Sequence, residues 1–333
     1  MHVQPPVKLA MYAVLVVLLG TTGTAAAARC ERPAIREDHP GRRELASGAV
    51  REAALVDGAL VWISGDTTWR MSQDGCLEAL RDGEEVPQLV SRRLVVDGTA
   101  VLTMTKEALV EPGPSGPLRR IPIVGLPDQP ETFAVHDGAV YLNVFRGDAI
   151  YKVTIATGQV ETFAKLPADS GHFGLSLAAS DAALYVTSYG KRWLAEVPFA
   201  TRAPKILTRA LPSGPVGVAV ANGQVFVNCE DGPRFAGALL RIDLATAKSQ
   251  VIATKLVNSD QLLVDDGFVY LRSYVKTKER RTANVNLLRV PVDGRGKLEL
   301  VEGNLPRATQ PLVASADAVF AAGNGAMIRI AKR

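Results

Sequence analysis

The 333-residue sequence is poor in the residues that most often build catalytic and metal sites. It has four histidines and three cysteines, and aromatic residues make up 6% of it. Only His39, His136 and His172 lie beyond the N-terminal segment, so a metal centre made of several imidazoles is not expected. The absence of a Cys-x-x-Cys pair excludes a zinc knuckle and a thioredoxin-like redox site. A Gly-x-Ser-x-Gly nucleophile elbow and a phosphate-binding Gly-x4-Gly-Lys-Ser/Thr loop are also missing.

An excess of charge of one sign is missing as well. The chain has 38 Lys and Arg residues against 34 Asp and Glu residues, and the small positive excess is spread along its length. A nucleic-acid-binding protein usually concentrates basic residues on one face. The chain is therefore not expected to bind nucleic acid.

Long hydrophobic runs are absent except at the N-terminus. There Lys8 precedes an almost continuous apolar segment over 9–19, which is followed by small residues over 21–28. This order is typical of a secretory signal peptide. The apolar segment is about half the length of roughly 20 residues that a membrane-spanning helix needs, so no membrane span is expected.

These features predict a signal peptide over residues 1–28 and a polar tail over 29–43. The mature protein is then secreted or periplasmic. Lipidation of Cys30 is the competing interpretation, but a lipidated cysteine follows a small residue and here Arg29 precedes it.

A pattern of about forty residues repeats along the rest of the chain. Each copy has an apolar strand, a turn of Asp-Gly or Asn-Gly type, and a second strand that begins with small and aliphatic residues. Seven copies occur, and the third residue after the first turn residue marks them at Leu60, Ala100, Val140, Leu184, Val225, Val269 and Val319. Asp-Gly and Asn-Gly adopt the positive φ angles of type I′ turns, so each copy predicts a tight β-hairpin.

A second hairpin follows the first in most copies, as in 149–155 with 159–164. Two hairpins give four short strands in each repeat, and no segment has a helical period. Four antiparallel strands in about 40 residues are typical of one blade of a β-propeller. The sequence therefore predicts an all-β, seven-bladed propeller of four-stranded antiparallel blades over 44–333.

The two ends of the repeat region predict how the ring closes. The last copy has three expected strands, 312–315, 318–322 and 326–331, before the chain ends at Arg333. The segment 44–51 has the length of a strand but precedes the first copy. We expect it to pair with 326–331, which would complete the last blade and cover its open edge.

The cysteines follow from this layout. An odd number leaves at least one thiol unpaired, although an exported protein is compatible with a disulfide. Cys76 is expected in a turn between the third and fourth strands of a blade, and Cys229 at the end of a second strand near the other face. A Cys30–Cys76 disulfide that ties down the N-terminal tail is the favoured pair.

The hairpins resemble those of secreted bacterial β-propellers of the YncE-like and YWTD-like kind. The resemblance covers about 44–333 and lies in core hairpins such as 263–271, so it implies architecture and not a function. The Gly-His and Trp-Asp pairs of WD repeats do not recur from copy to copy.

Two weaker resemblances suggest enzymes. The run Gly171-His172-Phe173-Gly174 is similar to that of streptogramin lyases, propellers in which a histidine acts as a base, although no partner for His172 is evident. Gluconolactonase-like propellers hold a divalent cation in the channel, and Asn143, Asn228 and Asp260 are the candidate ligands here. A packing or hydrogen-bonding role is the alternative for each of these residues.

Binding is suggested by the places where the repeats grow. The connection between the second and third strands is short in repeats one to four, whereas repeat five inserts 229–237 and repeat six inserts 273–286. Both insertions are expected on one face of the ring. The predicted binding residues are Arg234, Tyr274, Lys276, Lys278, Arg280 and Arg281, whose composition suits an anionic group. A solvated basic hairpin extension is the alternative.

The leading hypothesis is an exported, monomeric, non-enzymatic propeller without a cofactor. It would bind an envelope or extracellular protein, or an anionic polymer, through this face. A lyase or lactonase that uses His172 or a channel metal is the alternative function.

Overall fold

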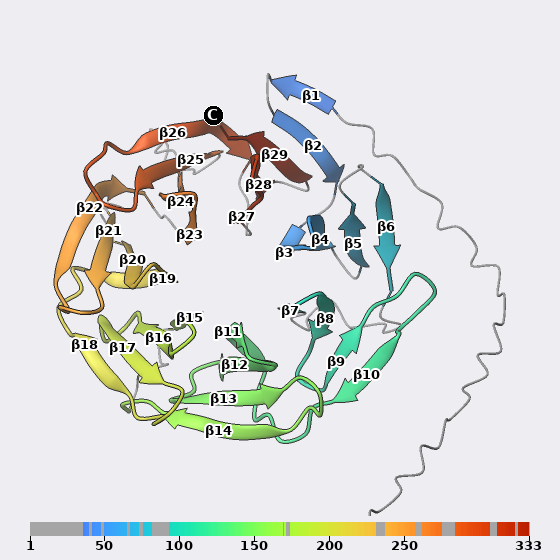
Figure 1. Ribbon diagram of the computed structural model, residues 1–333, viewed down its shortest axis with the longest axis horizontal. Helices are drawn as coiled ribbons and strands as arrows, with labels where there is room; N and C mark the ends of the chain where they lie inside the picture. Colours follow the sequence, from blue (N-terminus) through green and yellow to red (C-terminus); the bar gives the residue numbers. More distant parts are fainter. Residues whose placement is uncertain are drawn as a thin grey trace, which may run out of the picture.

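The protein is a seven-bladed β-propeller whose blades surround a central channel (Figure 1). The computed structural model describes residues 36–39, 42–47, 50–64, 67–72, 76–81, 93–168, 170, 174–230, 237–257, 262–274, 284–306, 312–323 and 326–332. All regular structure in these residues is β-strand, arranged in seven antiparallel sheets. The predicted fold class is therefore confirmed.

The four strands of each blade follow chain order, from strand a at the channel to strand d at the rim. Blade one has β3 (Val50–Val56), β4 (Ala59–Ser64), β5 (Thr67–Met71) and β6 (Leu77–Leu80). Blade two has β7 (Arg93–Asp97), β8 (Ala100–Met104), β9 (Ala108–Glu111) and β10 (Arg119–Pro122). Blade three has β11 (Pro130–His136), β12 (Ala139–Val144), β13 (Ala149–Thr154) and β14 (Val160–Lys165).

The next three blades repeat this order. Blade four has β15 (Leu175–Ala179), β16 (Ala183–Ser188), β17 (Trp193–Pro198) and β18 (Lys205–Thr208). Blade five has β19 (Gly214–Ala221), β20 (Gln224–Glu230), β21 (Gly237–Asp243) and β22 (Ser249–Leu256). Blade six has β23 (Leu262–Asp265), β24 (Phe268–Tyr274), β25 (Asn284–Pro291) and β26 (Glu299–Pro306).

Blade seven joins the two ends of the chain. It contains β27 (Leu312–Ala314), β28 (Ala318–Gly323) and β29 (Ala326–Ala331), and β2 (Arg42–Ser47) pairs antiparallel with β29. Closure by an N-terminal strand is confirmed. Outside β2, β1 (Arg36–His39) adds a fifth strand, so His39 lies in a strand within the segment expected to be a polar tail.

The bounds predicted for the closing strand, 44–51, were wrong. The strand starts earlier because Arg42 already pairs with Ile330, and it ends at Ser47. Val50 instead begins blade one, where it pairs with Ser64 and is buried. The apolar side chain of Val50 therefore belongs to the first repeat and not to the closing strand.

The hairpin turns explain the repeated dipeptides. Asp57-Gly58, Asp137-Gly138, Asn222-Gly223 and Asp266-Gly267 all have positive φ at both residues, as a type I′ turn requires. Blade two differs, because Asp97 pairs with Ala100 and the turn is Gly98-Thr99, one residue later than the repeat predicted. In the copies without glycine, the hydroxyls of Ser180 and Ser315 accept hydrogen bonds from the backbone amides of Ala183 and Ala318, both at 3.2 Å.

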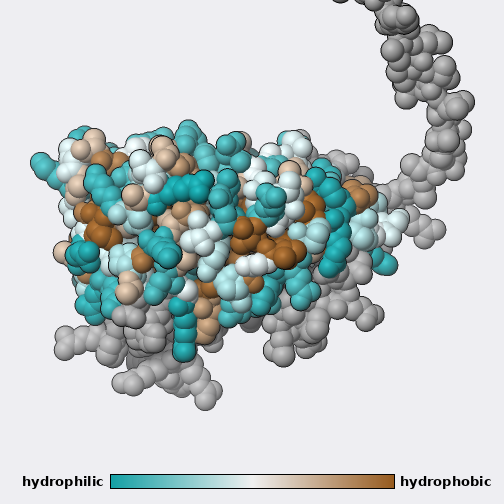
Figure 2. Space-filling model, turned by 90° about the horizontal axis from the view of Figure 1, so that it is seen from below, coloured by the Kyte–Doolittle hydropathy of each residue, from teal (hydrophilic) through white to brown (hydrophobic). Residues whose placement is uncertain are grey.

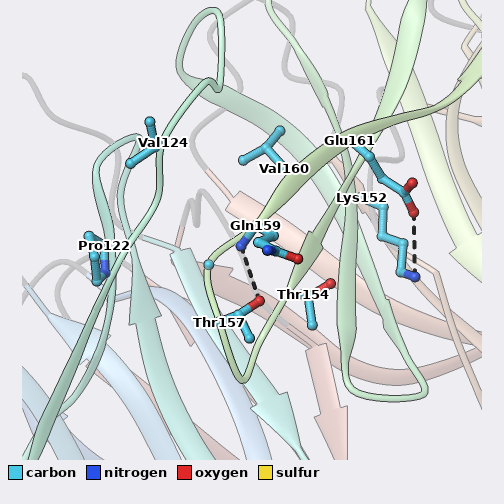
Figure 3. Close-up of a pocket in the computed structure, with 9 residues that line it drawn as sticks. Pro122, Val124, Lys152, Thr154, Thr157, Gln159, Val160 and Glu161 are labelled. Carbon is cyan, nitrogen blue, oxygen red and sulfur yellow. Dashed lines mark hydrogen bonds and ion pairs between the residues drawn. The ribbon is translucent and has the colours of Figure 1, made fainter.

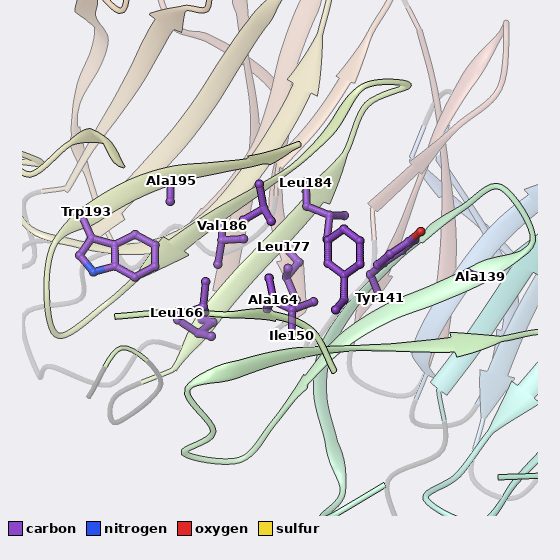
Figure 4. Close-up of a cluster of buried hydrophobic side chains, with 13 residues drawn as sticks. Ala139, Tyr141, Ile150, Ala164, Leu166, Leu177, Leu184, Val186, Trp193 and Ala195 are labelled. Carbon is purple, nitrogen blue, oxygen red and sulfur yellow. The ribbon is translucent and has the colours of Figure 1, made fainter. Parts of the chain in front are cut away.

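The core is divided among the seven contacts between neighbouring blades, with one buried apolar cluster in each. Figure 4 shows the cluster between blades three and four, where Tyr141 and Ile150 lie near Leu184, Val186 and Trp193. Burial of each large apolar side chain stabilises the fold by about 1.5–3 kcal/mol. The ring is therefore held together by the same kind of contact at every junction.

The rim is mostly polar, with apolar side chains scattered among the polar ones (Figure 2). Leu118, Val124, Phe145, Val251, Leu298 and Leu300 are the exposed large apolar residues in the described part of the chain. No helix long and apolar enough to cross a membrane occurs among the described residues.

Candidate functional site

The strand registers place the b–c and d–a connections at the same end of the ring. The first residue of strand a lies opposite the last residue of strand b, as Pro130 lies opposite Val144 and Gly214 opposite Glu230. We call this end the b–c/d–a face. The two longest b–c connections lie here, since β20 and β21 are separated by residues 231–236 and β24 and β25 by 275–283. The other b–c connections have two to four residues.

The mouth of the central channel opens on this face as a pocket of about 470 Å³. Strand a of every blade contributes to its wall. The lining is apolar at Phe133, Leu175, Leu177, Val216, Val218, Leu262 and Leu312 and polar at Glu52, Arg93, Glu131, Thr132 and Ser176. The three charged residues come from blades one, two and three, so the charge is confined to one side of the channel.

A chain of polar contacts joins these three blades across the channel mouth. Arg93 Nη1 donates to Glu52 Oε1 at 2.8 Å, and Arg93 Nη2 donates to the backbone carbonyl of Glu131. The second oxygen of Glu52 accepts from the backbone amide of Leu94. Glu52 and Arg93 are mostly buried, with 14% and 21% of their side chains exposed. Such a pair stabilises the ring only while both partners are present, because either charge alone would be left without compensation.

Burial has the largest effect on Glu52. It raises the pKa of the Glu52 carboxyl, although the nearby charge of Arg93 and the hydrogen bonds from Leu94 and Arg93 lower that pKa. Glu52 therefore holds its proton to a higher pH than an exposed glutamate does.

The chain of contacts continues into blade three through an amide. Asn143 is fully buried on β12, and its Nδ2 donates to Glu131 Oε2 at 3.3 Å and to the carbonyl of Val144 at 3.2 Å. Its Oδ1 is buried and accepts no hydrogen bond from the described residues. A buried acceptor without a donor costs about 1–3 kcal/mol, so this amide is kept at a cost to the stability of the fold.

Asn143 is one of several buried polar residues at the same position of strand b. The equivalent residue is polar in blades three to six and apolar in blades seven, one and two: Asn143, Thr187, Asn228 and Arg272, against Ala322, Ile63 and Met104. All of these side chains are buried. Blades three to six therefore have a polar layer between the blades just below the b–c/d–a face.

Most of the binding residues predicted from the sequence cannot be placed. Arg234, Lys276, Lys278, Arg280, Arg281, His172 and Asp260 lie outside the described residues. Tyr274 ends β24, is half-buried, and donates its backbone amide to the carbonyl of Val257 at 2.8 Å. The described residues thus contain the frame of the predicted binding face but not its basic loop.

The residues considered for catalysis are held by ordinary contacts where they are described. His136 lies in β11 and stacks on Phe199, with ring centroids 4.3 Å apart. Asn143 is buried in β12 of blade three and Asn228 in β20 of blade five, and the described residues contain no cluster of three His, Cys, Asp or Glu side chains suited to a metal.

The cysteines occupy the expected elements. Cys76 lies between β5 and β6 and is disulfide-bonded, whereas Cys229 is a free buried thiol in β20. Burial raises the pKa of the Cys229 thiol to about 12, which keeps it protonated and unreactive. Cys30 lies outside the described residues, so its pairing with Cys76 stays a prediction.

Glu52, Arg93 and Glu131 were not predicted from the sequence. A signal was available for Glu52, because Glu52, Thr132 and Ser176 each lie five residues before the first residue of the repeat turn or of its counterpart. Arg93 lies five residues before the observed turn at Gly98 but four before Asp97, where the repeat predicted the turn. That spacing selects residues whose side chains reach the channel mouth. Glu131 escapes it, since the register of β11 shifts between Pro130 and Thr132.

A second, open cavity of about 610 Å³ lies on the outer side of blades two and three (Figure 3). Lys152 pairs with Glu161 on one wall at 3.5 Å, and Pro122 and Val124 form the other. Gly158 closes the base so tightly that a Cβ there would lie 1.9 Å from the carbonyl oxygen of Pro122. This cavity adjoins a c–d turn, away from the long b–c connections, and its charged groups are paired with each other.

Comparisons with known proteins place the chain by fold. No protein-family model matches it, and no curated protein matches it in sequence. It is similar to YCF48, solved bound to a D1 peptide, with 13% identity and a TM-score of 0.64 over 89% of this chain and 98% of that one.

Two further solved structures have the same architecture. A chain of the Mitotic Checkpoint Complex is 11% identical with a TM-score of 0.60, over 98% of this chain and 99% of that one. The Pan2 WD40 domain of Neurospora crassa is 8% identical with a TM-score of 0.59, over 86% and 90%. At these identities the likeness shows the seven-bladed propeller fold alone.

Proposed function

We propose that the chain is an exported, non-enzymatic propeller that binds a protein or an anionic polymer of the cell envelope through its b–c/d–a face. The observation that carries this proposal is the coincidence of two features at one end of the ring. The two longest b–c connections, 231–236 and 275–283, belong to neighbouring blades and open on the face that holds the polar channel mouth. Long loops on a rigid scaffold are common sites of binding.

The composition of the blade-six connection favours an anionic group on the partner. It holds four cationic residues, Lys276, Lys278, Arg280 and Arg281, against the single acid Glu279. YCF48 was solved with a peptide bound, and another propeller neighbour belongs to a multiprotein complex, which agrees with a binding role for this fold. Nothing among the described residues favours a lyase or lactonase, since His172 and Asp260 lie outside them.

A heparin column tests the proposal with a defined anionic polymer. Replacing Lys276, Lys278, Arg280 and Arg281 together by Ser should lower the NaCl concentration at which the protein elutes, because exposed cations bind polyanions in competition with salt. The melting temperature should change little, since exposed substitutions seldom cost more than about 0.5 kcal/mol.

The matched control removes the same charge from the other end of the ring. Lys205, Lys248, Arg295 and Lys297 are exposed residues at or beside c–d turns. Their combined replacement by Ser should shift the elution much less. Equal shifts for the two variants would show that binding to heparin depends only on the net charge of the protein. The assignment of the binding face would then be wrong.

Export is tested separately by the N-terminus of the secreted protein. We expect it to begin within a few residues of Arg29 in mass spectrometry of the extracellular or periplasmic fraction. Retention of residues 1–20, or a lipid on Cys30, would contradict the predicted signal peptide.

A further inference from the structure

The junction of blades three and four at the channel mouth is rich in acceptors and poor in donors. The Glu131 carboxylate lines the pocket, and its Oε2 accepts from Asn143 Nδ2. No other hydrogen bond or ion pair reaches this carboxylate from the described residues. Asn143 Oδ1, fully buried beside it, also lacks a donor there. The Glu131 carboxylate is therefore an acceptor open to a ligand in the pocket, and Asn143 supports it from the buried side.

The cation of the channel mouth does not compensate Glu131. Arg93 directs Nη1 to the Glu52 carboxylate and Nη2 to the backbone carbonyl of Glu131, and its described ion pair is with Glu52 alone. Of the described residues that line the pocket, Arg93 is also the only cationic one. The Glu131 carboxylate thus faces the channel without a cationic partner from the described part of the chain.

The remaining walls suit an organic cation better than a metal ion. A hard divalent ion needs about six to eight oxygen ligands, and among the described residues the acidic lining of this corner is the Glu131 carboxylate alone. Phe133 and Leu175 line the pocket on the strands that flank the corner, and such surfaces pack against the methylene groups of a long side chain. The pocket volume of about 470 Å³ is ample for one such side chain.

We propose that this corner of the channel mouth binds a basic side chain, the ammonium of a lysine or the guanidinium of an arginine, presented by an extended segment of a protein partner. The cation donates hydrogen bonds to the Glu131 carboxylate, which Asn143 Nδ2 holds from the buried side, and its aliphatic part enters the channel. This inference rests on the proposed use of the b–c/d–a face and names a protein as the partner. The basic loop of blade six would then bind acidic groups of the partner, and this acidic corner would bind a basic side chain of the same partner.

The test uses the secreted full chain and three pentapeptides with acetylated and amidated ends, in which glycines flank a central lysine, arginine or norleucine. NMR titration should give at least about tenfold tighter binding for the lysine or the arginine peptide than for the norleucine peptide, as expected for a hydrogen bond to a charged group. The difference between the lysine and arginine peptides identifies which cation fits.

The variant Glu131→Gln should remove this preference while keeping an acceptor for Asn143. Glu131→Asp keeps the charge but shortens its reach, and should bind the basic peptides with intermediate affinity. Asp266→Asn is the matched control, because it removes one carboxylate at the opposite end of the ring and Asn222 shows that asparagine fits the same turn position. The control should retain the full preference.

Equal affinity for the norleucine peptide, or an unchanged preference in a folded Glu131→Gln protein, would overturn the inference. Displacement of the basic peptides by millimolar CaCl2 but not by NaCl of equal ionic strength would also overturn it, in favour of a metal site. The heparin comparison separates the two proposals, since it depends on the blade-six loop and not on Glu131.

Discussion

Blades one and two and blades four and five carry the polar groups of the channel mouth on different strands. Blades one and two have Glu52 and Arg93 on strand a, opposite the apolar Ile63 and Met104 on strand b. In blades four and five, strand a has the small residues Ser176 and Gly217, opposite the buried polar residues Thr187 and Asn228 on strand b. Blade three has both kinds, Glu131 on strand a and Asn143 on strand b.

This difference between the blades indicates where the channel mouth can bind a ligand. Charged groups on strand a keep contact with water in the channel and pair across neighbouring blades, as Glu52 does with Arg93. Polar groups on strand b lie between blades, where hydrogen bonds come from the protein, from ordered water or from a ligand. Among the described residues, only blade three brings an uncompensated carboxylate against a buried amide, which is why we place the binding corner there.

The largest effect, on all the blades, is expected from opening the ring. Deleting 30–47 removes β1 and β2 and exposes the edge of β29, which the closing strand covers. We expect the protein to lose more than about 5 kcal/mol of stability, on the scale of the whole stability of many domains, and to aggregate or melt without cooperativity. Calorimetry and light scattering measure both.

The control for this deletion removes 30–41 only. It takes away Cys30 and β1 but leaves β2 in blade seven. A cooperative transition should survive in it. If both deletions melt like the parent, closure by β2 does not hold the ring.

A smaller effect is expected from breaking the ion pair between Glu52 of blade one and Arg93 of blade two. Glu52→Leu leaves the Arg93 guanidinium mostly buried without a counterion, which should cost about 3 kcal/mol in urea unfolding. The double variant Glu52→Leu with Arg93→Met should recover most of this loss, since no charge is then left over. Glu111→Leu, in the more exposed Glu111–Arg119 pair, should cost less than about 1 kcal/mol. Equal losses at Glu52 and Glu111 would contradict the special role of the buried pair.

The polar layer of strand b in blades three to six is tested by two apolar replacements. Thr187 Oγ1 is buried and makes no hydrogen bond with the described residues, so Thr187→Val should be neutral or stabilise the protein by up to about 1 kcal/mol. Asn143→Leu, in contrast, removes the donor to Glu131 and should destabilise by about 2 kcal/mol. The same sign and size for the two variants in urea unfolding would argue against a distinct corner in blade three.

The smallest effect is the pH dependence that Glu52 gives to the stability of the protein. Its pKa is raised in the folded protein, so folding is favoured by the protonated form. This contribution is complete below the ordinary pKa of 4.5 and is lost as the pH rises through the higher pKa of the folded state. The difference in melting temperature, parent minus Glu52→Gln, should therefore fall as the pH is raised above 4.5. A difference that grows with pH would show that Arg93 controls the ionisation of Glu52.

The repeat itself was readable because it is a local property of the chain. Dipeptides such as Asp137-Gly138 fix a turn by their own backbone preferences, and apolar alternation on each side fixes the strands. Seven copies on one period determine the blade number. The closing strand was also predicted, from the number of strands in the last copy. Its bounds are 42–47 rather than 44–51 because Val50 packs with blade one.

The channel mouth was decided by tertiary structure. Glu52, Arg93 and Glu131 are separated by about forty residues in sequence and meet only because each strand a faces the same axis. Ion pairing, burial and the availability of an oxygen such as Asn143 Oδ1 depend on which side chains the ring brings into contact. Hairpin signals therefore determined the architecture of this protein, whereas its charged corner arises from contacts between blades, which no local pattern specifies.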